Sequence, residues 1–325
     1  MKLTKFFLLI TIIFISDLAF ANGRGELKQM DRGNIAGITS KSRTESLEFD
    51  TFYKTYKELK ATEKWDDIVK LCNKTLAVRL PPKEEAILNV ILVSNLFYLG
   101  RHDEALYAAD RAVILAESAF EDLELYAKGL YLKSAASRAL ALKSSNESSK
   151  RSYQEISLSC IGKALRMRDS FFPLTAGKIL FNAGALHQDV IKDQNKAANY
   201  YEEAIKKFEI AESEDDLHRV SIRYARLLLE ENKPRTALEK IRDIKVNLDT
   251  KTGIQLCLCK SKIYSALGDH ARALGLAMKV KEAALAKNMV FEAKESTKII
   301  EGIKAIDPSI SPVPEKLVAA ASIER

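Results

Sequence analysis

The stretch LGRHDEALYAADRAVILA, residues 99–116, decides the fold of this chain, because a near copy of it follows at residues 267–277, LGDHARALGLA. Counted from the glycine, a histidine stands two residues later and alanines stand five and nine residues later in both stretches. A helix that ends at the glycine, followed by a second helix with small residues on one face, forms a helical hairpin. A hairpin that recurs along the chain indicates an array of repeats.

The same register can be followed through the whole apolar-periodic part of the chain. The small or apolar residue that corresponds to the first alanine recurs at intervals of 37, 52, 40, 40 and 36 residues, at Ile68, Ala105, Ser157, Ala197, Ala237 and Ala273. Four of these five intervals fit one helical hairpin per repeat. We place the extra residues of the long interval in a polar loop, KSSNESSKR at residues 143–151.

Local signals agree with this period. Gly100 and Gly268 stand where the first helix of a hairpin ends in a left-handed residue. Asp193 and Asp269 stand where the second helix needs an N-cap. Pro234 stands at the start of a second helix, where its missing N–H is harmless. We therefore expect about six hairpins.

The array resembles the tetratricopeptide repeat (TPR) family between about residues 46 and 306. Hairpins two, four and six match its motif well, whereas hairpins one and five carry Glu63 and Asn232 in place of the turn glycine and hairpin three is also degenerate. The resemblance implies an all-α, right-handed superhelix of stacked antiparallel helix pairs whose concave groove binds a peptide or protein segment. The matching residues are Gly100, Gly268, Ala105, Ala197, Ala237, Ala273, Tyr201, Ala112, Ala164 and Ala204.

The N-terminal residues 1–21, MKLTKFFLLITIIFISDLAFA, read as a cleaved secretory signal. Two lysines precede an apolar run that is too short for a comfortable permanent span, and small residues stand before the expected cleavage point. An uncleaved anchor is the alternative. We expect an exported chain, periplasmic or secreted, with a flexible lead-in over 22–44, the array over 45–306, and a tail or capping segment over 307–325.

Charge and cysteine content narrow the classes of function. The formal net charge is +7, but acidic and basic residues are interspersed and no basic run alternates with aromatics, so we expect no nucleic-acid partner. Four cysteines in 325 residues are too few for a disulfide framework. We interpret them as buried thiols that pack as small apolar side chains.

No motif in the sequence supports catalysis, a cofactor or a metal. His102 and His270 occupy the same repeat position as Trp65, where a ring packs across the turn, and His187 and His218 stand alone without zinc-site spacing. Nucleophile-elbow, phosphate-loop and dinucleotide motifs are absent from the sequence. We predict a protein that is not an enzyme.

One basic stripe is a candidate binding site. In the family, three positions of each first helix line the groove, and in the fifth hairpin these are Arg219, Arg223 and Arg226, spaced i, i+4 and i+7. Lys262 holds the last of these positions in the sixth hairpin. We hypothesise that these four side chains form an anion-favouring floor for an acidic peptide. The alternative is an ordinary solvated helix face.

The sequence thus predicts an exported, non-catalytic scaffold or adaptor that binds a protein or peptide and has no stable membrane insertion after signal cleavage. Two alternatives stay open. One is an accessory subunit that recruits a cell-envelope enzyme, and the other is a hydrolase with an unrecognised site.

Overall fold

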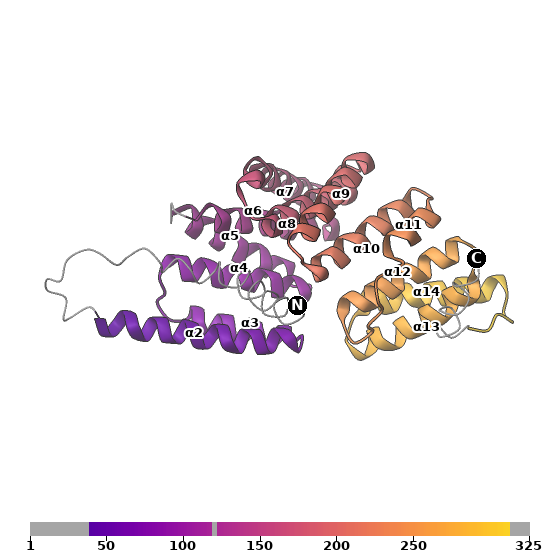
Figure 1. Ribbon diagram of the computed structural model, residues 1–325, viewed down its shortest axis with the longest axis horizontal. Helices are drawn as coiled ribbons and strands as arrows, with labels where there is room; N and C mark the ends of the chain where they lie inside the picture. Colours follow the sequence, from indigo (N-terminus) through magenta and orange to yellow (C-terminus); the bar gives the residue numbers. More distant parts are fainter. Residues whose placement is uncertain (1–38, 119–121, 313–325) are drawn as a thin grey trace, which may run out of the picture. The chain divides into compact units, whose positions relative to one another are not determined.

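The computed structural model describes residues 39–118 and 122–312 (Figure 1). The signal sequence, most of the lead-in and all but the first six residues of the tail lie outside them. By its internal contacts the chain divides into two units, residues 1–51 and 52–325, and the array described below belongs to the second. Helix α2 spans the boundary and begins at Thr39, six residues before the predicted start of the array.

The described part of the chain contains α-helices and two short helical segments of other types, and no strand (Figure 1). Consecutive helices pack as antiparallel pairs, which confirms the predicted all-α solenoid of stacked hairpins. The paired helices are α4 (Pro82–Tyr98) with α5 (His102–Ser118), α6 (Leu123–Lys143) with α7 (Glu147–Met167), α8 (Pro173–Leu186) with α9 (Gln194–Ile210), α10 (Glu214–Glu230) with α11 (Pro234–Ile241), and α12 (Lys251–Ala266) with α13 (His270–Ala286). Helices α2 (Thr39–Ala61) and α3 (Trp65–Leu76) stand at the place of the first hairpin in the sequence, and α3 packs on α4.

A further helix, α14 (Val290–Ile306), follows the sixth hairpin and packs against both α12 and α13. Its buried Ala293 joins a core cluster with Leu258 and Leu276, and Ile303 packs on Leu274. It therefore covers a face of the last hairpin that a repeat array otherwise exposes.

The repeat register defines the core. The six aligned positions, Ile68, Ala105, Ser157, Ala197, Ala237 and Ala273, are all fully buried, with 0% of their surface exposed. Small residues there let neighbouring helices approach closely. Ser157 is accommodated because its hydroxyl donates to the carbonyl of Ser134 on α6 at 2.9 Å.

Helix ends follow the predicted signals. Gly100 and Gly268 have φ of 72° and 79°. Asp193 and Asp269 accept hydrogen bonds from backbone N–H groups three residues later, at 3.0 and 3.1 Å. Left-handed backbone also occurs where glycine is replaced, at Glu63 and Asn232 among others. The turn therefore keeps its geometry when its residue type changes.

The predicted polar loop at 143–151 is wrong for most of its length. Helix α6 ends at Lys143 and α7 begins at Glu147, because the side chain of Asn146 caps α7 by accepting from Ser149 N–H at 3.0 Å. Both helices are 21 residues long. The extra residues of this repeat therefore lie in two long helices.

A second irregularity lies between α8 and α9. Residues His187–Ile191 form a π-helical turn, labelled η3, that ends at a left-handed Lys192. The wider turn changes the direction of its side chains relative to the α-helix before it. Such turns occur often at functional sites, and this one carries the buried carboxylate described next.

Candidate functional site: a row of cations across four hairpins

The four predicted groove residues lie on α10 and α12, but their surroundings are less positive than the sequence indicates. Arg219 lies 3.4 Å from the Asp216 carboxylate, and Arg223 bonds the Asp189 carboxylate. Lys262 lies 2.6 Å from Glu295 of α14. Three of the four cations therefore have a carboxylate partner within the protein.

Arg226 and Lys262 lie together beside the thiol of Cys259. Burial raises the pKa of Cys259, and the charges of both cations oppose that rise. All four cysteines are buried and free, as predicted. The predicted stripe is thus divided: Arg226 and Lys262 lie around Cys259, whereas Arg219 and Arg223 join cations from other hairpins.

Arg223 belongs to a buried cluster that we call the Asp189 centre: Asp189, Arg138 and Arg223. Arg138 of α6 and Arg223 of α10 both donate to Oδ2 of Asp189, which is on the π-helical turn. The three side chains are only 12%, 24% and 15% exposed for Arg138, Arg223 and Asp189. Burial lowers the pKa of Arg138, and the neighbouring charge of Arg223 adds to this effect. One carboxylate serves two arginines here.

Hydrogen bonds of neutral groups extend this centre. Gln188, 4% exposed, donates through Nε2 to both carboxylate oxygens of Glu230 at 3.0 Å. The Tyr201 hydroxyl donates to Oε1 of Gln188 at 2.8 Å. The Tyr201 ring lies against Gly184 of α8, where an added Cβ would come within 2.6 Å of the ring. Three successive hairpins are therefore joined at one polar cluster.

A second set of cations, which we call the cationic row, comes from successive first helices: Lys128 of α6, Lys178 of α8, Arg219 of α10 and Lys251 of α12. Burial lowers the pKa of Lys178, and the charges of Arg219 and Lys128 lower it as well, while Asp216 opposes them. Burial likewise lowers the pKa of Lys251, to which Arg219 contributes. The positive charges of neighbouring members of the row therefore act on one another electrostatically.

Among the ion pairs that the described residues form within the row, fewer carboxylates than cations take part: Glu124 and Asp216 pair with three side chains of the row. Lys128 pairs with Glu124 at 3.0 Å. Asp216 is shared, since it lies 3.6 Å from Lys178 and 3.4 Å from Arg219. The sharing of one acid between two cations repeats the arrangement at the Asp189 centre.

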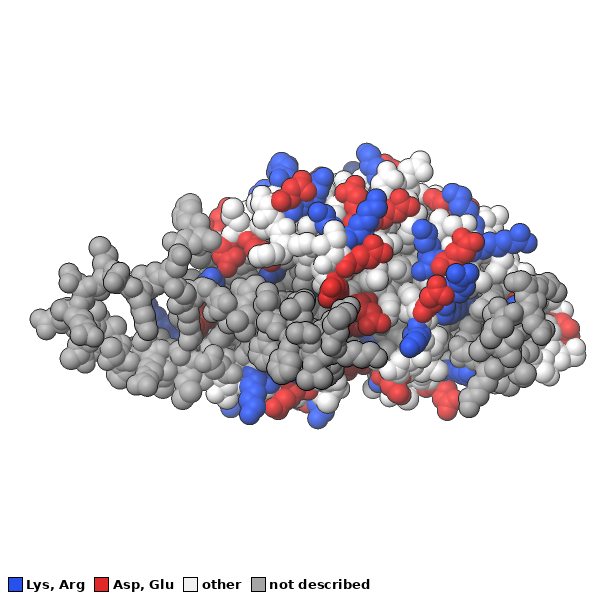
Figure 2. Space-filling model, in the orientation of Figure 1, with Lys and Arg blue, Asp and Glu red and all other residues white. Residues whose placement is uncertain are grey.

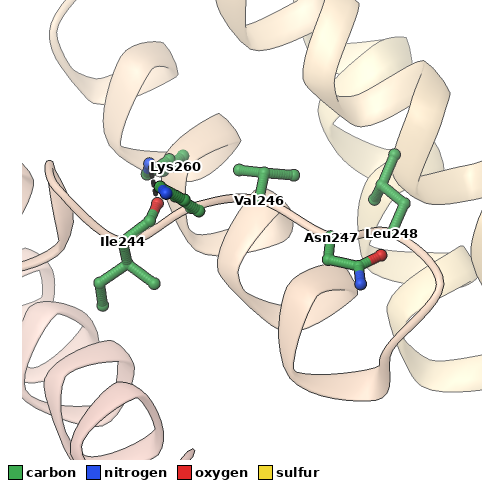
Figure 3. Close-up of a pocket in the computed structure, with 6 residues that line it drawn as sticks. Ile244, Val246, Asn247, Leu248 and Lys260 are labelled. Carbon is green, nitrogen blue, oxygen red and sulfur yellow. Dashed lines mark hydrogen bonds between the residues drawn. The ribbon is translucent and has the colours of Figure 1, made fainter. Parts of the chain in front are cut away.

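The surface charge of one face and a pocket beside α12 are two further candidate binding features. On the face seen in Figure 2, basic and acidic side chains are intermingled. A cavity of about 600 Å³ lies under the link between α11 and α12, lined by Ile244–Leu248 and Lys260, whose Nζ donates to the Ile244 carbonyl at 3.2 Å (Figure 3). The link presses on α12 so closely that a Cβ on Gly253 would lie 1.7 Å from the Asn247 carbonyl oxygen.

His102 packs as the sequence predicts, whereas Trp65 packs on the end of α4 and not across its own turn. The ring of His102 lies 4.8 Å from that of Phe97, across the turn, and Trp65 stacks on Tyr98 at 4.6 Å. In the described ranges, no three side chains of His, Cys, Asp or Glu gather as metal ligands would. None of the helices placed there is long and apolar enough to cross a membrane.

No known family model and no curated protein matches this sequence. A solved structure of a Rap protein complexed with competence and sporulation factor does resemble it, with a TM-score of 0.54 and 14% identity over 84% of this chain and 77% of that one. The fold is of the TPR type. Aspartyl phosphate phosphatase F from Bacillus subtilis aligns with a TM-score of 0.49 and 13% identity, over 85% of this chain and 75% of that one.

The TPR2AB domain of yeast Sti1 in complex with pHSP90 aligns with a TM-score of 0.30 and 16% identity, over 82% of this chain and 99% of that one. At these identities the likeness concerns the TPR-type fold alone.

The sequence indicated Arg219 and Arg223 but not Lys128, Lys178 and Lys251 of the row, nor Asp189 and Arg138, the partners of Arg223. Lys251 is the first residue of α12, one turn before the family's groove positions. In hairpin three the greater length of α6 and α7 removes the register on which those positions are counted. Asp189 is on a π-helical turn for which the sequence has no simple signal. The row residues also share no common position in the repeat register, so their spacing in the sequence does not indicate the row.

Proposed function

We propose that this chain is a non-catalytic scaffold that binds an acidic segment of a partner protein along the cationic row. The observation that carries the proposal is the sharing of acids. Within the row, Asp216 serves both Lys178 and Arg219. Two cations there share one carboxylate, and their partly buried position strengthens the attraction for a further anion relative to open water.

An acidic peptide suits the row better than a nucleic acid. Binding to phosphates depends on many uncompensated cations along one surface. Here basic and acidic side chains alternate, so a flexible segment with spaced carboxylates matches the pattern. The TPR-type fold supports the proposal, because stacked hairpins present one face of several first helices to one ligand.

We also propose that the scaffold works outside the cytoplasm, in the periplasm or after secretion. This rests on the N-terminal sequence, with its basic start and apolar run.

Fluorescence anisotropy with labelled peptides tests the binding proposal. The probe is a peptide of about twelve residues in which Glu alternates with Ser, and its matched control carries Gln for Glu. We expect the Glu probe to bind and the Gln probe to bind at least tenfold more weakly. The double variant Lys128→Gln/Lys178→Gln should weaken Glu-probe binding about tenfold, or 1.4 kcal/mol.

The control variant removes the same charge elsewhere. Lys206 and Lys281 are exposed residues on α9 and α13, outside the row. Lys206→Gln/Lys281→Gln should change binding less than twofold at about 0.1 M salt, because screening weakens distant charges. Equal weakening by the two double variants would contradict the proposal.

A further inference from the structure

The Lys251 end of the cationic row is already in contact with a carboxylate of the chain itself. Glu63, in the turn between α2 and α3, places Oε1 3.5 Å from the backbone N–H of Lys251 and Oε2 3.9 Å from Nζ of Lys287. Glu63 adopts left-handed backbone, with φ of 52°. Its carboxylate thus bridges the start of α12 and the turn between α13 and α14.

Tyr98, the last residue of α4, completes this contact. Nζ of Lys251 donates to the Tyr98 carbonyl at 2.9 Å and lies 5.3 Å from the centre of the Tyr98 ring. The Arg219 guanidinium lies 5.8 Å from the same ring, on which Trp65 stacks. We call Glu63, Tyr98, Lys251 and Lys287 the clasp. It joins the first two hairpins to helices that come more than 150 residues later.

The clasp differs in kind from the contacts between neighbouring hairpins. Those contacts consist of buried apolar side chains such as Tyr201, Phe208 and Leu227 in one continuous cluster. In the clasp the joining groups are charged or polar, and the side chains of Glu63 and Lys287 are 30% and 37% exposed. Ion pairs at this exposure are weak and exchange readily with other ions.

We propose that the clasp is a carboxylate subsite at one end of the cationic row, held by Glu63 until a carboxylate of a bound acidic peptide replaces it. This inference rests on the proposed function and specifies where one acidic residue of the partner binds. The backbone N–H of Lys251 and the Lys287 ammonium, which Glu63 contacts in the free chain, then bind the partner's carboxylate, the charge of the Lys251 ammonium attracts it, and Glu63 turns to solvent. Binding of the peptide releases the first two hairpins from α12 and α13.

Competition gives the test. Glu63→Gln removes the internal carboxylate charge and keeps the side-chain shape, so binding of the Glu probe should tighten about threefold, the size expected for a half-exposed pair. Lys251→Gln should weaken it about threefold. In Glu63→Gln/Lys251→Gln the gain should disappear, because the subsite itself is lost. Asp66→Asn, an exposed acid on α3 close to Glu63, is the matched control and should change binding less than twofold.

Energy transfer between dyes provides an independent readout. The four native thiols are buried, so dyes attach to cysteines introduced at exposed Lys64 and Lys245. We expect the Glu probe, and Glu63→Gln without probe, both to lower the transfer efficiency. Circular dichroism melting checks that each variant is folded.

The outcomes separate the two proposals. If the wild type fails to bind the Glu probe, or Lys128→Gln/Lys178→Gln binds it as tightly as wild type, the proposed function and the subsite both fail. If that double variant binds weakly but Glu63→Gln binds with wild-type affinity, the subsite alone is overturned. Unchanged transfer efficiency on binding of the probe overturns the release of the clasp.

Discussion

In the Asp189 centre and in the clasp a carboxylate is held by two basic residues, yet the two places differ in burial and in what surrounds them. At the Asp189 centre two guanidinium groups hold one acid among neighbouring hairpins, with side chains 12–24% exposed. At the clasp Glu63 accepts from the backbone N–H of Lys251 and lies 3.9 Å from the Lys287 ammonium, both far along the sequence, and the side chains of Glu63 and Lys287 are 30% and 37% exposed. Burial makes the first arrangement a fixed part of the array, whereas solvent access lets the second one exchange partners.

The arginines and lysines suit these different roles. A guanidinium is planar and charged at all accessible pH values, so it maintains a buried pair. An ammonium is a strongly hydrated point charge on a flexible stem, so it moves easily between ligands and water. A carboxylate held by two basic residues is therefore a structural cluster where the side chains are buried and a binding subsite where solvent reaches them.

The largest effect is expected from Asp189→Asn, which tests the structural half of the comparison. Arg138 and Arg223 would face each other without their anion, so the free energy of unfolding should fall by about 3–5 kcal/mol. Urea unfolding followed by circular dichroism measures this. Asp189→Asn/Arg138→Met should recover much of the loss, because one buried charge is then absent. A loss below about 1 kcal/mol would mean that the arginines reach solvent.

An intermediate effect on stability is expected from protonation of His102. Arg138 of the Asp189 centre and Lys251 of the clasp both act on the pKa of this histidine. Burial lowers the pKa of His102 to about 4; the charge of Lys143 lowers it further, Asp103 opposes this, and Arg138 and Lys251 add smaller lowering effects. Its Nδ1 is buried without a hydrogen-bond partner. The unfolded chain, with an ordinary histidine pKa near 6.5, therefore takes up this proton first.

Stability that depends on neutral His102 is thus full above about pH 6.5 and is lost as the pH falls through about 4. We expect this loss to be roughly 1–2 kcal/mol after allowance for solvent screening. NMR titration of the His102 ring should show a higher pKa in Arg138→Met and a smaller rise in Lys251→Gln. A larger rise in Lys251→Gln would mean that the clasp controls this histidine.

The smallest effect on stability is expected from Glu63→Gln. A pair at this exposure contributes less than about 1 kcal/mol to the free energy of unfolding. Its contribution should vanish on raising salt from about 0.05 to 0.5 M, because screening acts on exposed charges, whereas the cost of Asp189→Asn should persist. Unfolding curves of wild type and variant at the two salt concentrations measure this. A cost above 2 kcal/mol would place the clasp among the structural clusters.

Much of the fold could be read from the sequence, because hairpin packing depends on local patterns. Six positions at repeat spacing predicted six fully buried residues, including the unusual Ser157. Turn glycines and capping aspartates act within a few residues of themselves, so their geometry followed as well. The length of α7 did not follow, since a run of Ser, Lys and Arg reads equally as loop or as exposed helix until the cap at Asn146 decides it.

The candidate site could be predicted only in part, because charge acts through space. The sequence determined that the chain is a TPR-type array with Arg219 and Arg223 on one face of one helix. Tertiary structure alone decided which acids those cations contact. Asp189 reaches both arginines through a π-helical turn, and Glu63 reaches Lys251 across 188 residues of chain. Periodicity fixes which face of a helix is buried, whereas electrostatic partners depend on how distant helices are brought together.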